Sequence, residues 1–248
     1  MAQAVGPAEY DAVLFDLDGV ITATAHVHAS AWKRMFDEYL KTRADSLNEP
    51  FRPFTEDDYL NHIDGRPRYD GVRTFLTARG IEIPEGGPSD PPDRETVCGL
   101  GNRKDELFNQ VLESDGVEVY EGSIRFLRWV REQGMKTAVV TSSKNREAVV
   151  ANAGLEEMFD TSVDGITISN NGLPGKPAPD CFLEAARRLE VEPKRAVVVE
   201  DAISGVAAGE AGGFGLVIGV DRLGVADELH RAGADLVVTD LGTLVPDP

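Results

Sequence analysis

The chain has 248 residues and a formal net charge of −18, a length that suits one large domain or two modest ones. This acidity argues against a protein that binds the phosphate backbone of nucleic acids, because such binding needs clustered Lys and Arg. Hydrophobic residues make up 42% and charged residues 27%, as in ordinary globular proteins, and the absence of 18 consecutive apolar residues predicts no membrane span.

Cysteine usage and the first residues bear on the compartment. Cys98 and Cys181 are the only cysteines and form no CxxC motif, so neither a disulfide scaffold nor a structural zinc site is expected. Residues 1–10 lack the basic and apolar regions of a signal peptide. We therefore expect a cytoplasmic protein, and a monomer, because neither an apolar heptad nor an edge-strand signal suggests an oligomer.

Short apolar runs alternate with helical patterns along most of the chain. Continuous β-branched runs are typical of strands that are buried on both faces of a parallel sheet. Alternation of such strands with helices predicts a doubly wound α/β domain, whose active site lies beyond the carboxyl ends of the strands. The predicted strands are residues 12–15, 137–140, 196–199, 215–218 and 236–238, and the predicted helices are 123–133, 144–153, 179–190 and 202–211.

The segment from residue 24 to residue 117 breaks this alternation. Trp32, Met35, Phe36 and Tyr39 fall on one stripe of a helix, and no convincing buried strand appears. We predict a helical cap at 24–117, inserted after the first strand of a core formed by 1–23 and 118–248. Two segments are interpreted as loops, residues 86–92 inside the cap and residues 167–172 inside the core.

Two acidic residues, Asp16 and Asp18, follow the first predicted strand, and Gly19 comes directly after them. Positions i and i+2 of an extended segment point the same way, so both carboxylates could face one cleft. A carboxylate can attack phosphorus, and a neighbouring carboxyl can move a proton. Taken alone, the pair could also be a helix N-cap and a turn.

Hydroxyl and basic groups follow the next strands. Thr141, Ser142, Ser143, Lys144 and Asn145 come after the second strand and could cradle a phosphate, although Ser and Thr are also ordinary N-caps. Further along, Lys176 precedes a helix that two prolines help to start. Its ammonium could neutralise phosphoryl oxygens, although taken alone it could be an ordinary surface lysine.

A second acidic pair, Glu200 and Asp201, ends the strand at 196–199. Magnesium prefers a few carboxylates together with phosphate oxygens and waters. Asp16 with Asp201, and with Glu200 as a further candidate, would supply such ligands, so the sequence predicts Mg²⁺ as the cofactor.

In order and spacing, these four motifs resemble the signature motifs of the haloacid dehalogenase superfamily. The resemblance implies a Rossmann-like α/β core with a parallel sheet and a mobile cap. It further implies Asp16 as nucleophile, Asp18 as general acid and base, and a Ser or Thr with Lys176 on the phosphoryl group. Mg²⁺ would lie on Asp16, Asp201 and the carbonyl of Asp18.

The segment from Phe15 to Thr22, followed by Thr24, His28 and Trp32, looks like the opening of the β-phosphoglucomutase-like subfamily. Residues 142–145 and 176–180 are similar to that subfamily as well. This likeness implies that Thr24 and His28 hold Asp18 when the cap closes. For His28, a packed helix residue is the alternative.

In the cap, the resemblance points to Arg68 as the group that binds the phosphate that is not transferred, and to Lys104 as a contact for sugar or phosphate. A solvated helix charge is the alternative for each. Asp64, Gly71 and Asp105 depart from the subfamily, where Lys, Ser and Asn are expected. The reaction class is therefore better supported than the substrate.

Three functions are compatible with the sequence. The leading hypothesis is an isomerase that interconverts β-glucose 1-phosphate and glucose 6-phosphate with glucose 1,6-bisphosphate as phosphoryl donor. The second is a phosphatase acting on a sugar phosphate or another small phosphomonoester, and the third is a catalytically silent binding protein. The partner is expected to be a small sugar phosphate, without nucleic acid or membrane.

Overall fold

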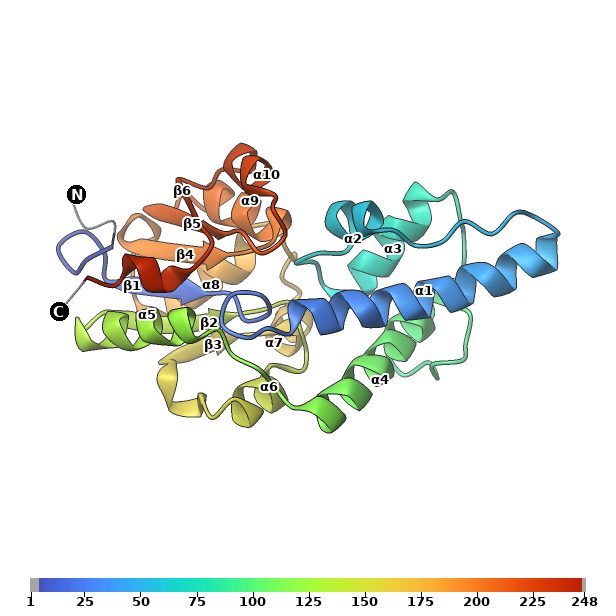
Figure 1. The fold of residues 1–248 in the computed structure, drawn as a ribbon, viewed down its shortest axis with the longest axis horizontal. Coiled ribbons are helices and arrows are strands. Elements are labelled where there is room, and N and C mark those ends of the chain that lie inside the picture. Colours follow the sequence, from blue (N-terminus) through green and yellow to red (C-terminus); the bar gives the residue numbers. More distant parts are fainter. Residues whose placement is uncertain (1–4, 247–248) are drawn as a thin grey trace. The chain divides into compact units, whose positions relative to one another are not determined.

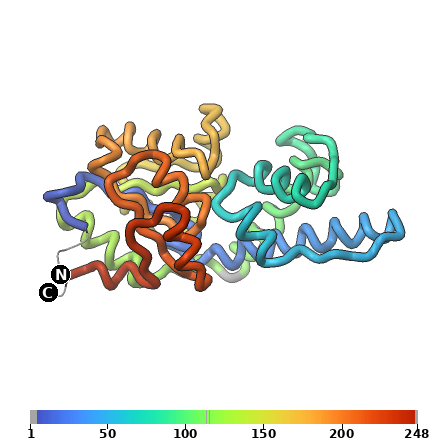
Figure 2. Tube along the Cα trace, turned by 90° about the horizontal axis from the view of Figure 1, so that it is seen from above, coloured from blue at the N-terminus to red at the C-terminus, as the bar shows by residue number. Residues whose placement is uncertain are grey.

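The computed structural model describes residues 5–246, and the chain divides into two compact units. The α/β unit comprises the described residues up to Ala23 and those from Val117 onward, and the helical unit spans Thr24–Gly116. Figure 1 shows the sheet with its covering helices and, separately, the helices of the second unit. Figure 2 follows the chain through the helical unit, from the blue first helix to the green return into the α/β unit.

The α/β unit is built on one six-stranded sheet in which every pair of neighbouring strands is parallel. The strand order is β3-β2-β1-β4-β5-β6, so the predicted α/β class with a parallel sheet is confirmed. The order reverses beside β1, which makes the carboxyl end of β1 the place where such sheets bind ligands. The strands are β1 (Ala12–Phe15), β2 (Lys136–Val140), β3 (Thr161–Val163), β4 (Ala196–Glu200), β5 (Leu216–Val220) and β6 (Leu236–Val238).

Helices cover both faces of this sheet (Figure 1). Leu14 of β1 belongs to the apolar cluster that includes Phe182, whereas the next residue, Phe15, contacts Phe126 with ring centroids 6.0 Å apart. Both faces of β1 are therefore buried, which explains its uninterrupted apolar sequence. The helices are α5 (Glu121–Glu132), α6 (Arg146–Asn152), α7 (Gly165–Asn171), α8 (Asp180–Leu189), α9 (Ile203–Ala211) and α10 (Ala226–Arg231), with 3-10 turns at Glu156–Met158, Pro193–Arg195 and Leu241–Leu244.

The structure differs from the sequence prediction at β3, at residues 167–172 and in the bounds of several elements. The strand β3 was not predicted, because Thr161–Val163 is short and only partly apolar. The loop predicted at 167–172 is wrong, because Gly165–Asn171 forms α7, whose N-terminus is capped by the Asp164 side chain accepting the Thr167 amide at 2.8 Å. The helix expected from residue 144 begins at Arg146.

The helical unit consists of α1 (Ala25–Leu47), α2 (Glu56–His62), α3 (Arg68–Ala78) and α4 (Val97–Asp115). The stripe predicted on α1 is buried, and it includes Trp32 and Phe36. Phe36 packs on Phe54 and Phe75, with ring centroids 5.1 Å and 4.2 Å away. The unit therefore has an aromatic core of its own. None of the helices within residues 5–246 is both long and apolar enough to cross a membrane.

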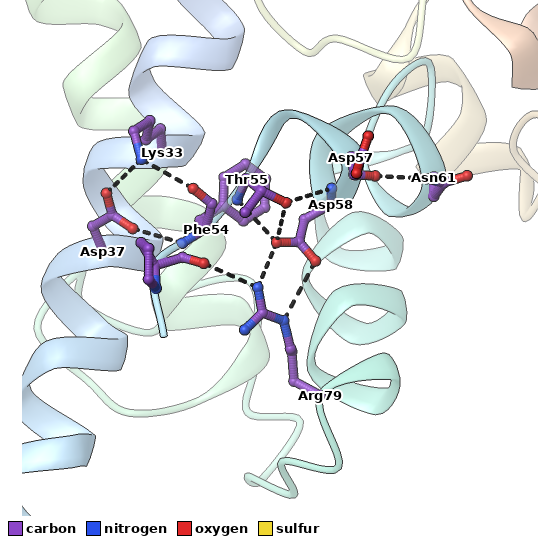
Figure 3. A network of polar contacts seen from close by, with 9 residues as sticks. Lys33, Asp37, Phe54, Thr55, Asp57, Asp58, Asn61 and Arg79 are labelled. Carbon is purple, nitrogen blue, oxygen red and sulfur yellow. Dashed lines mark hydrogen bonds and ion pairs between the residues drawn. The ribbon is translucent and has the colours of Figure 1, made fainter. Parts of the chain in front are cut away.

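A polar network joins α1, the following segment, α2 and the end of α3 (Figure 3). Thr55 caps α2 by accepting the amide of Asp58, and the Asp58 carboxylate in turn accepts from the Thr55 amide at 2.9 Å. Arg79 donates to both oxygens of Asp58 and to the carbonyl of Pro53. The guanidinium of Arg79 is thereby fixed in one orientation.

Candidate active site

The centre of the α/β unit's site is Asp16, which follows β1 and is only 6% exposed. Its amide donates to the carbonyl of Val199 at 2.9 Å, which extends the pairing of β1 with β4. One carboxylate oxygen, Oδ1, accepts from Lys176 Nζ at 2.6 Å. The same ammonium contacts a carboxylate oxygen of Glu200 and donates to the carbonyl of Val140 at 3.3 Å. The predicted residues 16, 176 and 200 are thus brought together.

The charges of this cluster do not balance. Burial raises the pKa of Asp16, the carboxylates of Glu200 and Asp18 raise it further, and Lys176 opposes these effects. Burial disfavours the ammonium of Lys176, but Asp16 and Glu200 outweigh it and raise the pKa of that lysine. Lys176 therefore stays charged, and its single ammonium faces two buried carboxylates, those of Asp16 and Glu200. The cluster would bind a further cation favourably.

Glu200 and Asp201 have different surroundings. Glu200 is fully buried, and while one oxygen contacts Lys176 the other accepts the amide of Ala202 at 3.0 Å. A Cβ added at Gly205 would lie 1.9 Å from this carboxylate, so only glycine fits there. Asp201 is half-buried at the end of the same strand.

The turn after β1 is shaped by Gly19. Its φ is +93°, and a Cβ there would lie 1.7 Å from Asp201 Oδ2. Glycine is therefore required both by the backbone conformation and by the close approach of Asp201. Asp16, Glu200 and Asp201 offer carboxylate oxygens that all lie within 4.8 Å of one another. This donor set, with its excess of negative charge, fits a divalent cation such as Mg²⁺.

Asp18 lies in the same turn and reaches across to the end of β2. Its Oδ2 accepts from the hydroxyl of Thr141 at 3.3 Å. The Thr141 hydroxyl also accepts the amide of Ser143 at 3.0 Å, and Ser143 Oγ accepts the amide of Asn145 at 3.1 Å. The segment predicted to bind phosphate, which also contains Ser142 and Lys144, is thus a hydroxyl-braced loop between β2 and α6.

Arg222, which the sequence analysis did not single out, follows β5 and also contacts the turn after β1. Its Nε donates to the carbonyl of Gly19 at 2.9 Å, and its Nη1 donates to the carbonyl of Thr239 at 2.8 Å. The guanidinium lies 3.6 Å from the centroid of the Tyr120 ring. Arg222 therefore ties the turn that carries Asp18 to two distant segments, and no sequence motif marks it.

In the helical unit, Arg68 begins α3 and is paired with α4. Its Nη1 lies 3.1 Å from Asp105 Oδ2 and donates to Asn102 Oδ1 at 3.4 Å. The Arg68 side chain is 14% exposed. Asp105, which departs from the subfamily pattern, is therefore the ion-pair partner of the predicted phosphate-binding arginine.

His28 and Lys104 also meet within the helical unit. Thr24 precedes α1, and its carbonyl accepts the His28 amide at 3.0 Å. The imidazole stacks on Phe108 with centroids 3.9 Å apart, and Lys104 Nζ contacts its Nδ1. Lys104 is 4% exposed and lies 5.3 Å from the Trp32 ring centroid. A buried cation is thus held between a histidine and aromatic faces.

These features define the class of protein. A buried carboxylate held by a lysine, a second carboxylate two residues on, and a hydroxyl-rich loop lie at the carboxyl edge of a doubly wound sheet. Such a site suits transfer of a phosphoryl group to and from a carboxylate, the chemistry of a phosphotransferase or phosphatase.

Comparison with known proteins gives the family. Residues 10–213 match the haloacid dehalogenase-like hydrolases, and the chain belongs to this family. It is 51% identical over 243 residues to β-phosphoglucomutase of Mycobacterium bovis, covering 96% of this chain and 93% of that protein. It is 31% identical over 236 residues to a phosphorylated carbohydrates phosphatase of Thermotoga maritima, covering 92% and 94% respectively.

A solved structure agrees with the fold. The crystal structure of β-phosphoglucomutase from Clostridium difficile superposes with a TM-score of 0.73 at 24% identity, covering 95% of this chain and 93% of that one. At this identity the likeness concerns the fold. The relatives together show an enzyme with phosphotransferase or phosphatase activity.

Proposed function

We propose that the protein is a β-phosphoglucomutase, which converts β-glucose 1-phosphate to glucose 6-phosphate through a phosphorylated Asp16. The observation that carries this proposal is the 51% identity, over nearly the whole chain, to the mycobacterial protein of that name. The buried contact of Asp16 with Lys176 supports the choice of nucleophile, because the ammonium orients one carboxylate oxygen and leaves the other for attack.

The proposed cycle begins with Asp16 phosphorylated by glucose 1,6-bisphosphate. Asp18 removes the proton from the C6 hydroxyl of β-glucose 1-phosphate as that oxygen attacks phosphorus, and the bond to the Asp16 carboxylate breaks. The bisphosphate then reorients so that its C1 phosphate faces Asp16. Asp16 attacks the phosphorus on C1, the C1 oxygen leaves with the proton from Asp18, and glucose 6-phosphate is released from phosphorylated enzyme. Over one cycle Asp18 takes up and returns one proton, and Asp16 ends phosphorylated, as it began.

Magnesium is the proposed cofactor, held by Asp16, Asp201 and the carbonyl of Asp18. When bound it would supply positive charge next to the phosphoryl oxygens. Both oxygens of Glu200 already accept contacts from Lys176 and Ala202. We therefore assign Glu200 to holding Lys176 rather than to direct coordination.

The remaining predicted residues are assigned by their surroundings. Ser142, with the loop residues Ser143, Lys144 and Asn145, would bind the transferring phosphoryl group next to Lys176. In the helical unit, Arg68 would bind the other phosphate and Lys104 the sugar phosphate. Thr24 and His28 would position Asp18 in the closed enzyme. Positioning and neutralisation of charge do most of the work in phosphoryl transfer.

The test of the main proposal is a product assay. The enzyme is incubated with Mg²⁺, β-glucose 1-phosphate and a trace of glucose 1,6-bisphosphate, and both glucose 6-phosphate and inorganic phosphate are measured. The mutase predicts glucose 6-phosphate with little inorganic phosphate. Inorganic phosphate as the sole product would overturn it.

A sugar-phosphate phosphatase is the alternative, favoured by the similarity to the Thermotoga phosphatase. It shares the first transfer to Asp16 but uses water as the acceptor. Arg68→Gln separates the two. A mutase must hold the phosphate of its substrate away from Asp16 while Asp16 carries another, whereas a phosphatase places its single phosphate at Asp16, so the variant should lose far more activity if the enzyme is a mutase. Arg73→Gln is the matched control, since Arg73 lies on the same helix and pairs with Asp70 and Glu85 at an exposed position.

A further inference from the structure

The helical unit contains a cavity of about 550 Å³ that the proposed reaction does not use. It is walled by the second half of α1, the segment that follows it, and the turn after α3. Its volume falls in the range of small-molecule sites. The lining residues are Leu40, Arg43, Ala44, Glu49, Pro50, Arg52, Arg79, Gly80 and Ile81.

The charge of this cavity is opposite to that of the whole chain. Arg43, Arg52 and Arg79 face a single acid, Glu49, on its walls, in a protein with a net charge of −18. Within residues 5–246 the structure gives neither Arg43 nor Arg52 an ion pair with a carboxylate. Arg43 interacts with the hydroxyl of Tyr39, but neither guanidinium is neutralised by a carboxylate of the described residues, and guanidinium matches phosphate and carboxylate in geometry.

The third arginine is held rigidly. Arg79 is fixed by Asp58 and by the Pro53 carbonyl (Figure 3). Its guanidinium also lies over the ring of Phe75, 5.2 Å from the centroid. The Asp58 carboxylate pairs with Arg79 but is not among the residues that line the cavity. Because Arg79 is already held in place, little conformational entropy is lost when it binds a ligand. The wall that Arg79 forms is therefore preorganised.

We propose that this cavity binds a small phosphate monoester with a hydroxylated carbon skeleton. A phosphate monoester carries a charge of about −1.5 to −2 near pH 7, which the positive charges of Arg43 and Arg52 match. Glu49 would disfavour a polyphosphate and can accept from hydroxyl groups. The side chains of Leu40, Ala44 and Ile81 offer apolar contact to the skeleton. The site belongs to the helical unit, whereas Asp16 and its partners belong to the α/β unit.

The test is a titration of the full-length, ¹⁵N-labelled protein with sn-glycerol 3-phosphate, followed through backbone amide signals. Saturable shifts are expected in residues 43–52 and 79–81, and uncharged glycerol should cause none. Arg52→Glu should weaken the binding read from these signals roughly tenfold or more. Arg52 is exposed, so this change should leave the remaining spectrum intact, and Arg43→Gln with Arg52→Gln is the second variant.

The matched control is Arg34→Glu, which makes the same charge change at an exposed position of α1 outside the cavity. It should leave the titration unchanged. The proposal is overturned by the absence of saturable shifts in these segments, or by equal binding in Arg52→Glu and Arg34→Glu. Inorganic phosphate that binds as tightly as glycerol 3-phosphate would overturn the part of the proposal that concerns the hydroxylated skeleton.

Discussion

The two units of the protein bury charge of opposite sign. In the α/β unit, Lys176 is surrounded by carboxylates at the ends of β1 and β4. In the helical unit, Lys104 lies buried beside His28 and aromatic rings, and Arg68 contacts Asp105 and Asn102. A phosphorylated sugar needs both environments, because the reacting phosphorus requires a carboxylate and the rest of the anion requires cations. Under the proposed function, the α/β unit would supply the chemistry and the helical unit the recognition of the substrate.

The largest expected effect comes from removing the nucleophile. Asp16→Asn keeps the shape of the side chain but cannot accept a phosphoryl group, so we expect kcat to fall by roughly 10⁴-fold or more. The assay is glucose 6-phosphate formation under saturating substrate, together with a check that the urea unfolding midpoint is retained. Asp11→Asn, at the exposed ion pair with Arg195, is the control. Activity within tenfold of wild type in Asp16→Asn would remove Asp16 from the chemistry.

The second prediction concerns the balance of charge around Lys176. Lys176→Met leaves Asp16 and Glu200 buried without their cation, which should lower the free energy of unfolding by about 3–5 kcal/mol. Added Mg²⁺ should restore part of this stability, because an ion that binds only the folded state stabilises it. Urea unfolding with and without Mg²⁺ measures both effects.

The control for this comparison is Lys194→Met, at an exposed position of the same unit. It should change neither the stability nor its dependence on Mg²⁺. If Lys176→Met were as stable as Lys194→Met, the cluster would not be the buried, unbalanced arrangement described above.

The sequence predicted the arrangement of the site in the α/β unit better than the arrangement of side chains in the helical unit. Asp16 and Asp201 could be placed because they adjoin apolar runs whose strands meet at one edge of a parallel sheet. Lys176 could be singled out because its motif falls between theirs in the order of the signature motifs. The bond between Thr141 and Asp18 joins residues 123 positions apart, and that between Arg222 and Gly19 joins residues 203 apart. Neither leaves a local pattern, so only the folded chain reveals them.

In the helical unit, the apolar stripe of α1 could be predicted but the side-chain pairs could not. Arg68 and Lys104 were each proposed as binding residues, yet their contacts with Asp105 and His28 depend on how α1, α3 and α4 pack. Helical periodicity gives the face of a helix and not its neighbour. The roles of these residues in binding stay predictions.

A smaller effect is expected for the binding of phosphate by Arg68. Asp105→Asn removes the charge that Arg68 pairs with, so Arg68 should bind a phosphate more readily. An ion pair of this exposure contributes about 1 kcal/mol, which corresponds to about fivefold. We expect KM for β-glucose 1-phosphate to fall by about this factor while kcat changes little, as initial rates would show. Asp70→Asn, beside the exposed Arg73, is the control, and an unchanged KM in Asp105→Asn would contradict the prediction.

The smallest effect is a pH-dependent one in the helical unit. Burial would raise the pKa of Asp58, but Arg79 and Thr55 outweigh it and hold that pKa below its usual value. Because the pKa of Asp58 is lower in the folded state, its ionised form stabilises the fold at pH values above the unfolded pKa of about 3.9. This stabilisation is lost as the pH falls through the folded pKa.

Asp58→Asn should therefore cost about 1 kcal/mol at pH 7 and progressively less below about pH 4. Urea unfolding of both proteins at pH 7 and pH 3 measures the difference. The neighbouring Asp57→Asn should show no such dependence on pH. A deficit in Asp58→Asn that is as large at pH 3 as at pH 7 would argue against an ionic role.

The position of β1 in the sheet also sets when the site can form. Asp16 lies near the start of the chain, but both neighbours of β1 lie more than 100 residues further on, at Lys136–Val140 and Ala196–Glu200. During synthesis, the first strand therefore has no sheet partner until the helical unit has been completed. Pairings this distant in sequence are slow to form. We expect the helical unit to acquire structure on the ribosome first, and the acidic cluster to assemble only after β4 has emerged.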